Sequence, residues 1–203
     1  LEFRRVLFRS WSARYAHGAF RRRYEFILRH LPKQGVRGQA WLDAGCGSGV
    51  FSRVLAGMGA HVIGVDASPA MLAEAQRSSE GDQMSARFVL VESLEHLPLE
   101  SASLDGVICL SVLEYVPDPA RCLQELHRVL RPGGVLIVTV PNAYSLLRGA
   151  QRVVRTVGQM IGKDWCSYLA VSRNAFSARA FRRCLLKNGF EARTTATFSP
   201  YAP

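Results

Sequence analysis

The chain has 203 residues, of which 48% are apolar and 21% are charged, and its formal net charge is +10. This length and composition suit one globular domain with a hydrophobic core and exclude a disordered chain. No apolar run is long enough to cross a bilayer. The five cysteines are scattered and never spaced as Cys-x-x-Cys. This spacing argues against a zinc site or a disulfide framework and favours a reducing compartment, the cytoplasm.

The first ten residues, LEFRRVLFRS, correspond codon by codon to a translated short-read sequencing adapter. A processing scar of this kind carries no information about the fold. We therefore predict that residues 1–10 are not native and that a single domain occupies residues 11–203.

From residue 11 to residue 140, amphipathic stretches alternate with short apolar runs. Ser68 can cap a helix that has Pro69 at its first position. Strands that alternate with helices and lack a polar alternation predict a doubly wound, mostly parallel sheet covered on both faces. The periodicity predicts helices over 11–31, 50–58, 69–78 and 119–130, and strands over 40–44, 61–65, 87–91, 106–110 and 135–140.

The pattern changes after Pro141. Apolar residues recur at helical spacing over 146–161, and the arginines of this segment lie off the apolar stripe. A second helix is predicted over 177–187, with Ser177 as its cap. Residues 190–198 are predicted to form a sixth strand.

The segment LDAGCGSG, residues 42–49, joins the first strand to the helix that follows it. Glycines let a ligand approach the backbone closely, and a helix N-terminus offers free N–H groups. A dinucleotide site requires Gly or Ala where this chain has Val50, and a phosphate-binding P-loop requires a lysine that is absent. Both phosphate-binding interpretations are therefore weakened.

Two aspartates flank this turn in the predicted fold. Asp43 comes just before the glycines, where it would repel a phosphate but could reach a cationic group. Asp66 ends the second strand, where a carboxylate can accept both hydroxyls of a ribose; alternatively, it could cap the helix that follows. The ligand should therefore carry a ribose and a positive charge with no phosphate nearby, and S-adenosylmethionine fits these three requirements.

Four ordered segments now resemble a known family. LDAGCGSG, VIGVDAS, SLEHLPLESASLDGVICLSVLEYVPDP and LHRVLRPGGVLIVTVPN are similar to the class I S-adenosylmethionine-dependent methyltransferases, especially the enzymes of ubiquinone and menaquinone pathways. The resemblance covers about residues 24–142. It implies a Rossmann-like fold with a leading helix and loop over 11–39, a cofactor-binding core over 40–142 and an acceptor-side and C-terminal part over 143–203.

The family fold ends in a hairpin of two antiparallel strands. Only the first of them, over 190–198, can be identified in the sequence. We therefore expect the last strand to be missing and the native chain to be truncated at both ends.

The resemblance also implies a cofactor site. The three glycines of the turn would contact the amino acid and sugar of the cofactor, and Asp66 would bind the ribose. Ser93 stands where many relatives carry an acidic residue that contacts the adenine amine, and it is either such a contact or an ordinary turn residue. The implied cofactor-binding residues are Asp43, Ala44, Gly45, Cys46, Gly47, Gly49, Asp66, Ala67, Ser93, Leu94, Leu110 and Ser111.

A sulfonium is already an activated methyl donor, so the enzyme must mainly orient the acceptor and exclude water. Related quinone-pathway enzymes carry an E-x-x-E-H metal cluster after the fourth strand; here only Glu114 of it is present, so no metal is expected. Glu114 is a candidate general base, or simply a carboxylate on a helix face. Tyr15 and His17 could close over the cofactor as catalytic residues, or could serve only in packing.

The acceptor is expected to be a small or lipid-like molecule, with O-methylation favoured. Residues 146–161 could form a lid over it, touch a membrane surface, or pack on their own domain. No DPPY- or NPPY-type segment follows the fourth strand, which argues against nucleic acid as a substrate. The alternatives are a non-catalytic binding module that kept the fold and a nucleotide-dependent oxidoreductase.

Overall fold

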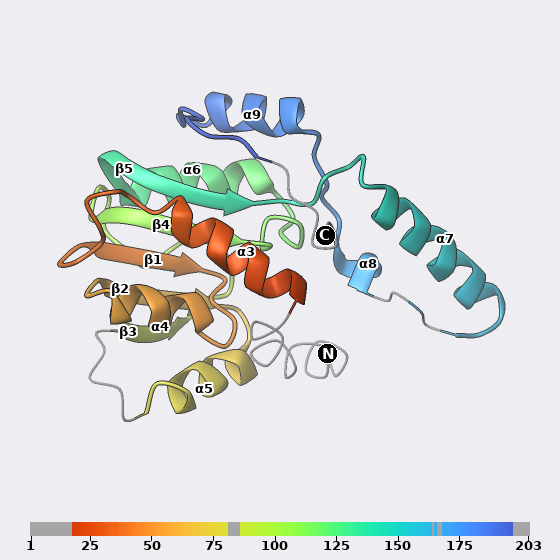
Figure 1. Cartoon of the computed structure of the whole chain (residues 1–203), viewed down its shortest axis with the longest axis horizontal. Helices are drawn as coiled ribbons and strands as arrows, with labels where there is room; N and C mark the ends of the chain where they lie inside the picture. Colours follow the sequence, from red (N-terminus) through yellow and green to blue (C-terminus); the bar gives the residue numbers. More distant parts are fainter. Residues whose placement is uncertain (1–17, 81–85, 164, 166–167, 197–203) are drawn as a thin grey trace.

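The computed structural model of the chain describes residues 18–80, 86–163, 165 and 168–196. Within these residues, five strands form one sheet in the order β3-β2-β1-β4-β5, and every neighbouring pair is parallel (Figure 1). The strand order reverses between β1 and β4, and this is where parallel α/β sheets open a crevice for a ligand. The strands are β1 (Ala40–Ala44), β2 (His61–Asp66), β3 (Ala86–Leu90), β4 (Leu104–Leu110) and β5 (Leu130–Thr139).

Helices cover both faces of the sheet, as Figure 1 shows. On one face, α3 and α4 pack around the fully buried Trp41 and Ile108. On the other face, α6 and α9 pack against Leu42 and Val107. Neighbouring residues of one strand therefore enter different cores, as the period of two in a strand requires. The helices are α3 (Gly18–Arg29), α4 (Val50–Gly57), α5 (Pro69–Arg77), α6 (Pro119–Val129), α7 (Leu146–Met160), α8 (Tyr168–Val171) and α9 (Ala178–Lys187).

The doubly wound parallel sheet predicted from the sequence is confirmed, and most element boundaries agree within one or two residues. The Ser68 cap is also confirmed, because its side chain accepts the N–H of Met71. β5 starts earlier than predicted: it begins at Leu130, directly after α6, and its pairing with β4 is irregular between Leu104 and Gly106. The predicted helix over 11–31 is described only from Gly18 onward, and residues 1–10 lie outside the described residues.

The sixth strand predicted over 190–198 is wrong for residues 190–196, which form no strand. A strand needs a neighbouring strand for its backbone hydrogen bonds. Here the N–H of Phe190 instead donates to the carbonyl of Leu185, at the end of α9. The described residues thus leave β5 as an edge strand.

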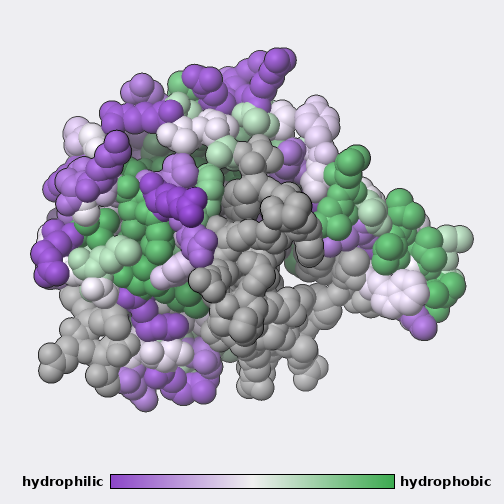
Figure 2. Space-filling view, in the orientation of Figure 1, coloured by the Kyte–Doolittle hydropathy of each residue, from purple (hydrophilic) through white to green (hydrophobic). Residues whose placement is uncertain are grey.

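The helix α7 projects from the body of the molecule (Figure 1), and its apolar stripe does not pack on its own domain, although Arg148 on its other side contacts Glu114 and Ser172. Figure 2 shows apolar side chains gathered on its outer side. Leu146, Val153 and Met160 are 91%, 64% and 81% exposed. None of the helices that the structure describes combines the length and apolarity needed to span a bilayer.

Candidate active site

The glycine turn lies at the carboxyl end of β1, beside the crevice where the strand order reverses. Gly45, Gly47 and Gly49 all have positive φ, at 75°, 55° and 72°, which a side chain would strain. A Cβ on Gly45 would lie 2.3 Å from the side chain of Val112, and one on Gly49 would lie 2.9 Å from the ring of Phe88. A Cβ on Gly47 would meet no atom within 4 Å. Packing explains the first and third glycines, whereas the second exposes bare backbone to open space.

The carboxylate of Asp66 connects this turn to the next helix. Its Oδ2 accepts the N–H of Gly47 at 2.9 Å, and its Oδ1 accepts the N–H of Ser68 at 2.8 Å. The N-cap of α5 is Ser68, so Asp66 does not cap the helix itself but holds the N-cap residue in place. The same contacts fix the carboxylate beside the open backbone of Gly47.

Asp43 lies beneath the turn and is only 3% exposed. Its Oδ2 accepts a hydrogen bond from the hydroxyl of Ser52 at 2.6 Å. Burial raises the pKa of Asp43 to about 7, and the nearby charge of Asp66 also raises it, although the hydrogen bonds from Ser52 oppose the shift. Asp43 therefore supports the start of α4 from below.

Two further residues of the predicted set are buried around the turn. Ala44 is fully buried at the end of β1, and Cys46 is 9% exposed. Burial raises the pKa of the Cys46 thiol strongly, and the charges of Asp43 and Asp66 add to this. The raised pKa favours the protonated thiol, which is a weaker nucleophile than the thiolate.

Ala67, Ser93 and Leu94 line the same cavity as the turn. Ser93 Oγ accepts the N–H of Glu95 at 3.1 Å, a local contact that is compatible with both interpretations of Ser93. Leu94 is 6% exposed and belongs to the core on the α6 side. Glu92, the residue before Ser93, also lines this cavity.

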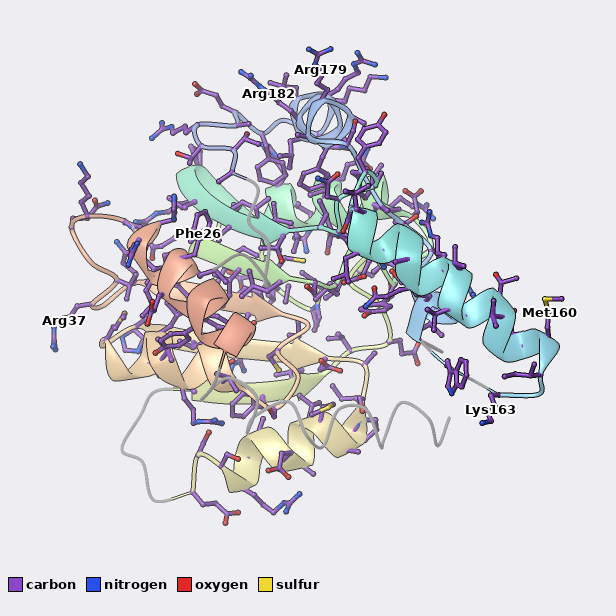
Figure 3. The ribbon with its side chains drawn as sticks, turned by 45° about the vertical axis from the view of Figure 1, so that its right-hand side comes forward. Phe26, Arg37, Met160, Lys163, Arg179 and Arg182 are labelled. Atoms are coloured by element: carbon purple, nitrogen blue, oxygen red, sulfur yellow. The ribbon has the colours of Figure 1, made fainter. Side chains whose placement is uncertain are left out.

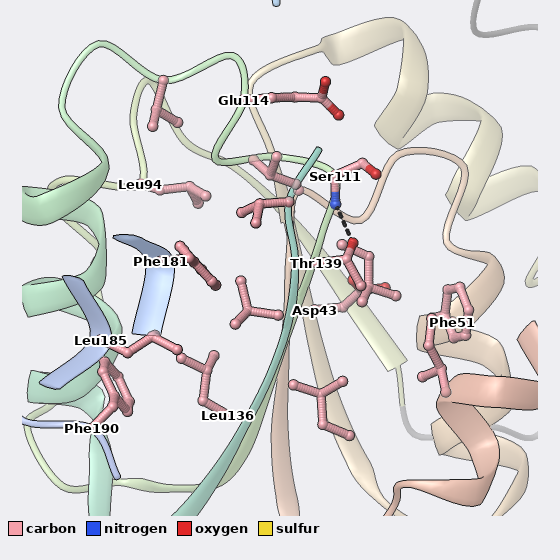
Figure 4. A pocket seen from close by; sticks show the side chains of 18 of the residues that line it. Asp43, Phe51, Leu94, Ser111, Glu114, Leu136, Thr139, Phe181, Leu185 and Phe190 are labelled. Carbon is pink, nitrogen blue, oxygen red and sulfur yellow. Dashed lines mark hydrogen bonds between the residues drawn. The ribbon is translucent and has the colours of Figure 1, made fainter. Parts of the chain in front are cut away.

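Leu110 and Ser111 stand at the end of β4. Ser111 has a φ of 56°, a conformation that few residues other than glycine adopt, and strain of this kind is typical of functional sites. Its N–H donates to Thr139 Oγ1 at 3.0 Å (Figure 4). Thr139, which the sequence did not single out, thus holds the strained residue from the end of β5.

Glu114 lies in a turn before α6 and is 7% exposed, so its interpretation as a carboxylate on a helix face is wrong. Its Oε2 accepts the hydroxyl of Ser172 at 2.8 Å and lies 3.4 Å from Nη2 of Arg148. Asn174 Nδ2 donates to the carbonyls of Leu113 and Val116. These contacts attach residues 172–174 to the loop that follows β4.

Arg148, Ser172 and Asn174 were also missed by sequence reasoning. The only signal was the spacing of Arg148, Arg152 and Arg155, which places them on one side of the helix. The other two catalytic candidates, Tyr15 and His17, lie outside the described residues.

A connected cavity of about 2010 Å³ joins the glycine turn, Asp66, Ser93, Glu114 and Thr139 and continues along β5. Figure 4 shows the apolar side chains of Leu136, Phe181 and Leu185 on one side of β5. Among the described residues, no three His, Cys, Asp or Glu side chains are grouped so that they could hold a metal ion. The cavity is large enough for a nucleoside together with a second small molecule.

The family described as a methyltransferase domain matches residues 42–138. The chain is similar to a ubiquinone biosynthesis O-methyltransferase of Xylella fastidiosa, with 36% identity over 140 residues, which are 66% of this chain and 55% of the relative. A protein of the same name from Pseudomonas paraeruginosa is 36% identical over 113 residues, which are 54% of this chain and 47% of that relative. The chain thus spans about half the length of the curated relatives it matches.

Solved structures share the fold. An S-adenosylmethionine-dependent methyltransferase from Methanosarcina mazei aligns with a TM-score of 0.65 at 21% identity, covering 81% of this chain and 84% of that one. A Haemonchus contortus phosphoethanolamine N-methyltransferase in complex with S-adenosyl-L-methionine aligns with a TM-score of 0.66 at 21% identity. The alignment covers 84% of this chain and 37% of that one.

The match over residues 42–138 and the similarity to these relatives support the class I S-adenosylmethionine-dependent methyltransferase family, as the four sequence segments predicted. The methyltransferase domain match supports S-adenosyl-L-methionine as the cofactor. The alternative of a nucleotide-dependent oxidoreductase is thereby set aside.

Proposed function

We propose that the protein transfers the methyl group of S-adenosylmethionine to an oxygen atom of a small-molecule acceptor. The observation that carries this proposal is the open backbone of Gly47 beside the fixed carboxylate of Asp66. The names of the relatives at 36% identity support oxygen as the methylated atom.

Each part of the cofactor has a counterpart in the cavity wall. The ribose hydroxyls would donate to Asp66, because a carboxylate can accept from several donors at once. The amino-acid part would lie along Gly45 and Gly47, with its ammonium near the carbonyl of Leu110 and near Ser111. The adenine would lie between Ala67 and Leu94, with Ser93 at its edge.

The protein's task in this chemistry is positioning. The sulfonium supplies the activated methyl group, and the chain must hold the acceptor oxygen in line with it and keep water out. A base is needed only where the acceptor must lose a proton. Glu114 is the candidate for that step among the described residues, and Tyr15 and His17 remain candidates for closing the site.

The test compares two glycines that differ only in location. Gly47 and Gly35 both have positive φ, and a Cβ on either would meet no heavy atom within 4 Å. Gly47→Ala and Gly35→Ala should therefore cost similar stability, about 1–2 kcal/mol. Only Gly47→Ala should weaken S-adenosylhomocysteine binding, by tenfold or more in calorimetry, because its methyl group would occupy the cofactor's place.

Equal affinity of both variants would refute the proposed cofactor position. NADH serves as the negative control ligand for the unsubstituted protein. Transfer of labelled methyl from S-adenosylmethionine to a component of a cell extract, identified by mass spectrometry, then tests catalysis. A protein that binds S-adenosylhomocysteine but labels nothing would be the non-catalytic binding module instead.

We also propose that α7 touches a membrane surface and that the acceptor is lipid-like rather than a nucleic acid. The exposed stripe of Leu146, Val153 and Met160 supports the first part. The absence of a DPPY- or NPPY-type segment after β4 supports the exclusion of nucleic acid. Four cysteines free of disulfides, at positions 46, 109, 122 and 184, are in keeping with the cytoplasm.

A further inference from the structure

The two sides of α7 differ in chemistry. Its outer side is apolar, and Figure 3 shows Met160 pointing away from the body of the molecule. Arg148, Arg152 and Arg155 follow one another at spacings of four and three residues, so they share the opposite side. Arginine on a projecting helix normally extends into water, and the first of these three does not.

The side chain of Arg148 is only 12% exposed. Its Nη2 donates to Ser172 Oγ and to Glu114 Oε2, which fixes the plane of the guanidinium. Its Nη1 is also buried, yet it has no hydrogen-bond partner in the part of the chain that the structure describes. A buried donor without an acceptor is costly, so its presence needs an explanation.

The location of Arg148 supplies one. Arg148 and Glu114 both line the cavity that contains the glycine turn. The fixed guanidinium therefore belongs to the wall where an acceptor would lie, and its Nη1 is covered by neighbouring atoms. A ligand oxygen that displaces this cover would satisfy the Nη1 N–H groups without changing the contacts to Glu114 and Ser172.

The charges around Arg148 determine which kind of ligand oxygen, neutral or anionic, would bind there most tightly. Glu114 offsets one positive charge, but Arg152 and Arg155 follow on the same side of α7. Together with Ser172 they line a second cavity, of about 310 Å³, whose described lining contains no acidic residue. Nε of Arg155 is likewise buried without a described partner. The described residues at this end of the site therefore keep an excess of positive charge.

We propose that Arg148 binds a carboxylate of the acceptor, so that the substrate is a carboxylic acid. Arginine pairs with carboxylates through charged, directional hydrogen bonds. An ordinary phenol, with a pKa near that of tyrosine at about 10, is neutral at pH 7 and would gain less. This assignment rests on the proposed function, because it names the substrate class of the same site.

The experiment measures binding of two probes by calorimetry in the presence of saturating S-adenosylhomocysteine. The probes are 3,4-dihydroxybenzoate and its methyl ester, which share their ring and hydroxyl groups but differ in charge. The unsubstituted protein should bind the acid at least tenfold more tightly than the ester. Arg148→Gln should reduce this ratio to about twofold or less.

Two further variants separate recognition from folding. Arg148→Gln removes a positive charge beside the buried Glu114, so the double variant Glu114→Gln with Arg148→Gln removes both charges, and it should lose the preference as well. Arg179→Gln makes the same change at an exposed position of α9 (Figure 3) and should keep the full ratio.

The outcomes distinguish this inference from the proposed function. If S-adenosylhomocysteine does not bind the unsubstituted protein, the proposed function fails first. If it binds but the acid is not preferred, or neither probe binds up to millimolar concentration, the carboxylate assignment is overturned while the cofactor site stands. Retention of the preference by the double variant also overturns it.

Discussion

At the scale of single residues, Asp43 has an ionisation that opposes folding. Its pKa is raised from the ordinary 3.8 to about 7 by burial. Between these two values the unfolded chain releases the proton while the folded chain retains it. The folded state therefore binds more protons, and its stability falls as pH rises from about 4 to about 7 and then levels off.

Asp43→Asn removes this effect, because an amide can still pair with Ser52 but carries no charge. The melting temperature of the variant should rise relative to that of the unsubstituted protein as pH increases from about 5 to about 8. Each 1 kcal/mol of difference in the free energy of unfolding corresponds to about 2–4 °C. Thermal denaturation without ligand, repeated across this pH range, measures the gain. Glu100→Gln, at an exposed position, controls for net charge. A gain that stays constant with pH would contradict the argument.

At the scale of elements, the loop after β4 depends on a segment from the far end of the chain. Asn174 Nδ2 donates to the carbonyl of Leu113 at 2.9 Å and to that of Val116 at 2.8 Å. The N–H groups of Arg173 and Asn174 both donate to the carbonyl of Glu114. The acceptor-side wall is therefore held by residues about sixty positions apart.

Asn174→Ala should loosen this wall, because it deletes two hydrogen bonds of about 1 kcal/mol each. Amide hydrogen exchange over residues 111–117 should become faster, whereas S-adenosylhomocysteine affinity should stay within about twofold. Asn188→Ala is the matched control, because its side chain bonds to Cys184 at the end of α9. Unchanged exchange over residues 111–117 would show that Asn174 does not hold the loop.

The same elements explain what the sequence could and could not predict. β1, β2 and β4 have near-continuous apolar runs, and helix α5 has a Ser-Pro start, so local patterns suffice for them. Residues 190–196 have the mixed apolar and polar composition of a half-buried strand. Whether they form one depends on a neighbouring strand to pair with, which no local pattern reveals. Glu114 was misplaced for a similar reason: its burial depends on Arg148 and Ser172, which are 34 and 58 residues away.

At the scale of the whole molecule, the projecting α7 combines an apolar outer side with a chain of net charge +10. Such a surface should bind anionic bilayers through both apolar burial and charge attraction. The two contributions can be separated, because salt screens only the second.

The protein should therefore co-sediment with vesicles of phosphatidylglycerol and dissociate partly as salt is raised. The double variant Val153→Ser with Met160→Ser should reduce the bound fraction several-fold. The control double variant, Met58→Ser with Leu186→Ser, changes an exposed apolar residue at the end of α4 and another on α9. It should leave the bound fraction unchanged. Equal loss in both double variants would mean that binding is not localised to α7.

The glycine turn and Asp66 are linked by contacts that span at most 19 residues, whereas the bonds that close the opposite wall cross 58 and 61 positions. One half of the pocket can therefore be inherited unaltered while the other diverges. Exchange of residues 141–176 between relatives would then change which compound is modified and leave the site of the methyl donor intact.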